Sequence, residues 1–196
     1  MENVTDRTSN PFGMRIPGPA VYGYGSANAD FHVVGDSPDR HGGLRTGVPF
    51  TASVAGARLQ RVLASVGLAG APYAERPDLP NTYWSYLHPT PRADGDTDLE
   101  RFLDAELRAI NAHIILPVGD RPLEYALREH TSQWNDLPHD ASELHAAEVR
   151  GRGFLVVPVA DPDEWGASEE RALTETLGSI LESDYRQTKG VATTIG

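Results

Sequence analysis

The side chains of this sequence that are best suited to acid–base chemistry are two aspartates and a histidine, each of which follows an apolar or aromatic segment. A carboxylate can orient or deprotonate a water molecule, and a histidine can donate a proton near neutral pH. The three residues and the segments they follow are Asp36 after 31–34, His88 after 82–87 and Asp161 after 154–159.

Each of these residues also has a purely structural interpretation. Asp36 and Ser37 precede a proline, where an Asx-type turn would use both side chains to satisfy backbone groups. His88 lies in a proline-rich loop, where a lone histidine is more often a surface residue, and Asp161 fits a solvated acidic turn. The sequence leaves the catalytic and the structural interpretation open for all three.

Composition excludes several other kinds of chemistry. The chain has 196 residues and no cysteine. It therefore has no disulfide, thiolate zinc site, thiol nucleophile or cysteine-held iron–sulphur cluster. His139 and His145 lack a recognised metal-ligand spacing, and the glycines form neither a dinucleotide fingerprint nor a phosphate loop. We expect neither a metal nor a cofactor.

The charge of the chain bears on its partners and its source. Lys and Arg number 17 against 28 Asp and Glu, which gives a net charge of −11. Such a charge normally disfavours nucleic acid, because phosphate binding is largely electrostatic. A salt-loaded cytoplasm would explain the same bias through screening, so composition suggests a halophilic source. The sequence has no membrane-length apolar run and no signal pattern, and we expect a cytoplasmic monomer without a membrane partner.

Strand-like and helix-like segments alternate along the chain. Apolar residues spaced at i, i+3, i+4 and i+7 predict a helix from residue 56. The alternation predicts an α/β fold of three layers, with a central, mostly parallel sheet of about four strands and helices on both faces. The other expected helices start near residues 99 and 122 and at a Ser168 cap, and the expected divisions are an irregular arm (1–28), the domain (29–185) and a disordered tail (186–196).

The predicted sheet also indicates where a ligand-binding site would lie. Ligands of such sheets bind beyond the carboxyl ends of the strands. Three loops would converge there, namely 35–50, 86–92 and 159–165.

Several motifs, taken in order, resemble those of the uracil-DNA glycosylase superfamily, most closely its thermostable iron–sulphur branch. Residues 33–38 (VVGDSP) resemble its first motif, an apolar strand ending in Gly-Glu-(Ala/Gly)-Pro, and 47–50 (GVPF) resemble its Gly-x-Pro-Phe. The resemblance runs from about residue 20 to about residue 183. It implies an α/β fold, DNA as the partner, and hydrolysis of the N-glycosidic bond of uracil or another deaminated base in base-excision repair.

The resemblance also implies roles for individual residues. Asp36 takes the place of a glutamate and would orient or deprotonate the attacking water. Phe50 would stack on a flipped base, with Ser37 beside it in the base site, although Phe50 could also be a plain core residue. Three arginines on the same rim could contact DNA phosphates, or simply keep the protein soluble: Arg40, Arg45 and Arg92.

Two residues depart from the family pattern, in addition to the missing cluster cysteines. Tyr86 stands where the family has an asparagine that reads the uracil edge, and it could block the pocket, stack on a base, donate its hydroxyl or pack in the sheet. Asp161 stands where the family has a histidine that donates to the leaving base. An ionised carboxylate would repel that base, so Asp161 could serve only if burial kept it protonated. His88 is the candidate substitute donor.

These observations leave two main hypotheses and do not decide whether the chain is an enzyme. The first is a monofunctional, cofactor-free DNA glycosylase with weak or altered activity. The second is an inactive relative that binds nucleic acid or a nucleobase without cleaving it. An unrelated α/β protein that binds a small molecule ranks lowest. Under either main hypothesis, we expect one cavity to be lined by Asp36, Phe50, Tyr86 and Asp161.

Overall fold

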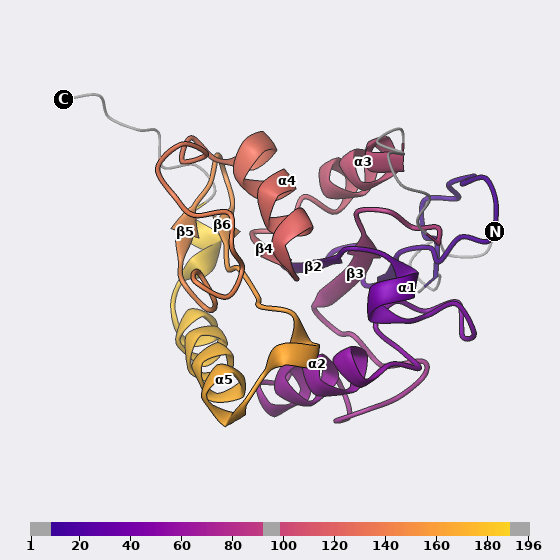
Figure 1. Ribbon diagram of the computed structural model, residues 1–196, viewed down its shortest axis with the longest axis horizontal. Helices are drawn as coiled ribbons and strands as arrows, with labels where there is room; N and C mark the ends of the chain where they lie inside the picture. The colour runs from indigo at the N-terminus through magenta and orange to yellow at the C-terminus, as the bar shows by residue number, and fades with distance from the viewer. Residues whose placement is uncertain (1–8, 92–98, 189–196) are drawn as a thin grey trace.

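The computed structural model describes residues 9–91 and 99–188, and these form one six-stranded sheet between two layers of helices (Figure 1). The strands are β1 (Tyr24–Gly25), β2 (Phe31–Gly35), β3 (Thr82–Tyr86), β4 (Ile114–Pro117), β5 (Val149–Arg150) and β6 (Leu155–Val156). The α-helices are α1 (Pro38–His41), α2 (Val54–Ser65), α3 (Glu100–Ile110), α4 (Asp120–His130) and α5 (Ala167–Glu182), and the 3-10 turns named below are η3 (Pro162–Glu164) and η4 (Tyr185–Thr188).

The strand order is β1-β3-β2-β4-β6-β5. The four central strands run parallel, as predicted, with Phe31 of β2 paired to Thr82 of β3 and to Ile114 of β4. The outer strands β1 and β5 are antiparallel to their neighbours, and we did not predict them. Each has only two residues, which is too short for a periodic pattern, and β1 lies within the segment predicted as an irregular arm.

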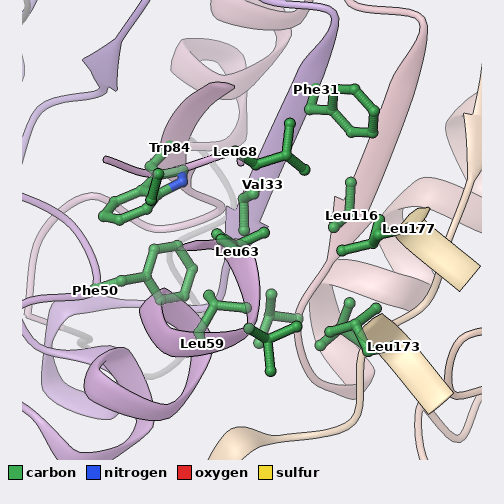
Figure 2. Close-up of a cluster of buried hydrophobic side chains, with 14 of the residues drawn as sticks. Phe31, Val33, Phe50, Leu59, Leu63, Leu68, Trp84, Leu116, Leu173 and Leu177 are labelled. Carbon is green, nitrogen blue, oxygen red and sulfur yellow. The ribbon is translucent and has the colours of Figure 1, made fainter. Parts of the chain in front are cut away.

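Successive residues of the central strands point to opposite faces of the sheet, which explains the two helical layers. Phe31 and Val33 of β2 belong to the core beneath α2 and α5, whereas Val34 joins the core beneath α3 and α4. Figure 2 shows the first core, in which leucines of α2 and α5 meet side chains of the sheet. The predicted three-layer arrangement is therefore confirmed.

Two helices begin earlier than the sequence predicts, because of local hydrogen bonds. Helix α2 starts at Val54, since Ser53 Oγ accepts a hydrogen bond from the backbone N–H of Gly56 at 3.0 Å. Helix α5 is capped at Gly166, whose N–H donates to the Glu169 carboxylate at 2.7 Å, so Ser168 is not the cap. No helix in the described part of the chain is long and apolar enough to cross a membrane.

The turn η4 lies against the start of β2, where the Asp30 carboxylate contacts several polar side chains. Asp30 Oδ2 accepts from Arg186 Nη2 at 2.7 Å and from the Tyr185 hydroxyl at 3.0 Å, while Oδ1 lies 3.0 Å from His113 Nδ1. Burial would raise the pKa of Asp30, but hydrogen bonds from Arg186, Asn81 and Tyr185 outweigh it and lower that pKa. Most of the predicted tail, from residue 189 on, lies outside the described residues.

Candidate functional site

The carboxyl ends of the parallel strands bring polar side chains from three loops and one helix to one edge of the sheet. Asp36 follows β2, His88 follows β3, Arg121 lies in the first turn of α4 after β4, and Asp161 follows β6. The backbone N–H of His88 donates to the carbonyl of Asp36 at 2.9 Å, which continues the β2–β3 pairing into the site. These side chains therefore form a candidate site at the edge of the sheet where ligands of such folds bind.

A histidine that sequence reasoning did not single out lies at the centre of this site. His41 ends the single-turn helix α1 and is fully buried. Its Nδ1 accepts a hydrogen bond from the backbone N–H of Asp36 at 3.1 Å. In the neutral ring this bond assigns the proton to Nε2, which lies 3.7 Å from Oδ2 of Asp161. His41 thus lies between the two aspartates predicted as catalytic.

The carboxylate of Asp36 is held by an arginine that the sequence analysis also missed. Arg121 Nη1 donates to Asp36 Oδ1 at 3.0 Å, and His88 Nδ1 lies 3.9 Å from the same oxygen. The side chain of Asp36 is only 9% exposed, so this ion pair is largely shielded from water. The available signal was the position of Arg121 directly before the helix that the sequence predicts from about residue 122.

Asp161 is bound by cationic and hydrogen-bonding groups that favour its charged form. Arg40 Nε donates to Asp161 Oδ2 at 2.5 Å, and the backbone N–H of Asp163 donates to Oδ1 at 3.1 Å. Burial acts to raise the pKa of Asp161, but the nearby His41 imidazole and hydrogen bonds from Asp163 and Arg40 outweigh it and hold that pKa well below its ordinary value. These contacts favour the ionised form of Asp161, which accepts hydrogen bonds and donates none, whereas the role of donor required a protonated Asp161.

Phe50 and Tyr86 are packed against each other in the core rather than facing solvent. Their ring centroids are 5.3 Å apart, and both side chains are buried (Figure 2 shows Phe50). The Tyr86 hydroxyl accepts from the backbone N–H of Phe50 at 2.8 Å and donates to the carbonyl of Gly42 at 2.9 Å. Burial raises the pKa of Tyr86, so its hydroxyl stays protonated. Donation of that hydroxyl to a base would require the bond to Gly42 to break.

Ser37 and two of the three predicted arginines lie on or beside α1. Ser37 is buried, and its carbonyl accepts from the backbone N–H of His41 at 2.9 Å. Arg40 is paired with Asp161, and Arg45 forms an ion pair with Glu75. Arg92 lies outside the described residues.

The loop that carries Asp161 is held in place by hydrogen bonds from helix α2. Arg58 of α2 donates through Nη1 to the carbonyls of Pro162 and Trp165, each at 2.9 Å. The indole Nε1 of Trp165 donates to the carbonyl of Ala160 at 2.9 Å. These bonds fix η3 against α2, so Asp161 sits on a firmly held segment.

Comparison with known proteins agrees with this geometry. Residues 22–176 match the profile of the uracil DNA glycosylase superfamily. The Type-5 uracil-DNA glycosylase of Pyrobaculum aerophilum is 26% identical over 174 residues, which covers 84% of this chain and 74% of that protein. Within residues 9–91 and 99–188, no three His, Asp or Glu side chains are grouped to hold a metal ion. With this match over residues 22–176, and with a mostly parallel sheet, the chain belongs to the uracil-DNA glycosylase superfamily.

Proposed function

We propose that this chain is a DNA glycosylase-like protein of base-excision repair that hydrolyses the N-glycosidic bond of uracil or another deaminated base, with weak or altered activity. The observation that carries the proposal is the shielded Asp36 carboxylate at the carboxyl edge of the sheet, fixed by Arg121 and close to His88. DNA is the proposed partner. We further propose a cytoplasmic, cofactor-free monomer.

Asp36 can serve the reaction in two ways. Its negative charge stabilises the oxocarbenium-like sugar that forms as the glycosidic bond breaks. It can also accept a proton from the water that adds to the sugar carbon. Arg121 holds Oδ1 of the carboxylate at 3.0 Å and so fixes its orientation.

The leaving base needs a hydrogen-bond donor, and this requirement limits the activity. The ionised Asp161 accepts from Arg40 and cannot donate to an anionic base. Loss of one such contact typically costs about 10²–10³ in rate. His88, which lies 3.9 Å from Asp36, is the candidate substitute donor.

A cleavage assay tests this proposal. The substrates are single-stranded and duplex oligonucleotides that carry uracil, hypoxanthine or xanthine, each at several salt concentrations. We expect slow excision that Asp36→Asn abolishes and that His88→Ala reduces at least tenfold, or about 1.4 kcal/mol, with DNA affinity nearly unchanged. Asp136→Asn, at an exposed aspartate, is the matched control.

The alternative function is a base- or nucleic-acid-binding relative that does not cleave. It is favoured by the ionised Asp161 and by the burial of Phe50 and Tyr86. Binding of these oligonucleotides without release of any base would support the alternative. Excision that Asp36→Asn leaves unchanged would exclude the proposed role of Asp36.

A further inference from the structure

We propose that His41 occupies the position that a flipped base would take beside Phe50, so that a side chain of the chain itself fills the base site. The inference rests on the proposed function, because it takes Phe50 as the stacking residue. It makes His41 the residue that decides whether a base can enter.

The rings of Phe50 and Tyr86 each lie at a small angle to the ring of His41, as in a stack of rings. The imidazole lies 5.4 Å from the Phe50 ring, with an interplanar angle of 27°, and 6.3 Å from the Tyr86 ring, with an angle of 28°. All three rings close on Gly35, the last residue of β2. A Cβ at Gly35 would lie 2.7 Å from Phe50 Cζ and from Tyr86 Cε1, and 2.8 Å from His41 Nδ1. The space beside Gly35 is therefore filled by these three side chains.

The two ring nitrogens of His41 lie beside one donor and one acceptor of the protein. Its Nδ1 accepts from the backbone N–H of Asp36, and its Nε2 faces the carboxylate of Asp161. The protein thus offers one donor and one acceptor to a flat ring. Uracil likewise carries carbonyls that accept and a ring N–H that donates, so it offers both kinds of partner that these groups require. When His41 is absent, both groups would face an empty, ring-sized space.

The segment that carries His41 and the loop that carries Asp161 differ in how they are held in the structure. Helix α1 has a single turn and is followed by Gly42 and Gly43 at φ values of 92° and 98°, which favour glycine. The Asp161 loop, by contrast, is braced by Arg58. Entry of a base therefore requires α1 to move, with loss of the bond from Ser53 Oγ to the His41 carbonyl at 2.7 Å and of the pair between Arg40 and Asp161.

Binding of free uracil by a His41→Ala variant tests the proposal without any need for catalysis. The matched control is His32→Ala, because His32 is equally buried but faces the other side of the sheet, where it bonds Ser85. By calorimetric titration, we expect His41→Ala to bind uracil at least tenfold more tightly than the wild type and His32→Ala. Imidazole, which replaces the missing ring, should compete with uracil in the His41→Ala variant.

A second variant keeps the proposal falsifiable. His41→Asn keeps an acceptor for the Asp36 N–H and replaces His41→Ala if the latter does not fold, as judged by circular dichroism. A folded variant that binds uracil no better than the wild type overturns the proposal, even if the wild type excises uracil from DNA. Tighter uracil binding without excision by any variant supports the proposal and counts against the proposed function instead.

Discussion

At the scale of single residues, the Tyr86 hydroxyl joins two points of the loop that forms the site. It accepts from Phe50 and donates to Gly42, and both of those backbone groups belong to the segment between α1 and α2. Phe50 has a φ of 54°, which is uncommon for a bulky residue. Its carbonyl is held by Gln60 Nε2 at 2.8 Å, so Tyr86 and Gln60 together stabilise an unfavourable backbone conformation.

We expect Tyr86→Phe to lower the free energy of unfolding by about 1–3 kcal/mol, because it leaves a buried donor and a buried acceptor unpaired. Urea denaturation monitored by circular dichroism measures the change. Tyr73→Phe is the control, since the Tyr73 hydroxyl bonds Ala52 of the same loop but the residue is 43% exposed, so water can replace the hydroxyl. Equal losses in the two variants would contradict the role assigned to Tyr86.

At the scale of elements, the turn η4 is attached to the amino end of the sheet, opposite the candidate site. The attachment depends on Asp30, which bonds Arg186 and Tyr185 of η4 and also Asn81 before β3. These bonds favour the carboxylate form and lower the pKa of Asp30 in the folded protein. The folded protein therefore binds fewer protons at Asp30 than the unfolded chain does in mildly acidic solution.

This linkage predicts how Asp30→Asn will respond to pH. A lowered folded pKa contributes stability that is fully present above the unfolded pKa of about 4 and is lost as the pH falls through the folded value. The free energy of unfolding of the wild type should therefore exceed that of Asp30→Asn most at neutral pH. Denaturant titrations from pH 7 to pH 3 should show the difference shrinking, and a difference that is constant with pH would refute the linkage.

Most of the central elements could be predicted from the sequence, whereas two residues of the site could not. Apolar runs and helical stripes mark β2, β4 and the main helices, because burial imposes a period on them. His41 lies in a glycine- and charge-rich loop, where no period indicates which way a side chain points. Its importance, like that of Arg121, arises from partners far along the chain. Only the folded structure brings such partners together.

At the scale of the whole molecule, the net charge of −11 lowers the stability of the folded state, and salt can reduce this loss. Repulsion among like charges destabilises the compact state, and screening weakens it. The halophilic source remains a proposal from composition, and stability in salt tests it.

We expect the melting temperature to rise as potassium chloride is increased from about 0.1 M towards about 2 M. Scanning calorimetry measures the rise. Sucrose solutions of equal osmolality are the control, because sucrose is excluded from protein surfaces but does not screen charge. An equal rise in sucrose, or no rise in salt, would show that charge repulsion is not what limits stability.

The short outer strands affect how readily the protein can aggregate through its sheet edges in concentrated salt. An open sheet edge offers unpaired N–H and C=O groups to other chains, and acidic proteins usually keep such edges apart by mutual repulsion. At high ionic strength that repulsion acts over only a few ångströms, so charge no longer prevents edge-to-edge assembly. In the described part of this chain, the sheet ends on both sides in a strand of two residues. Edges of this length give a second chain little to pair with, so protection against aggregation comes from geometry and persists when the charges are screened.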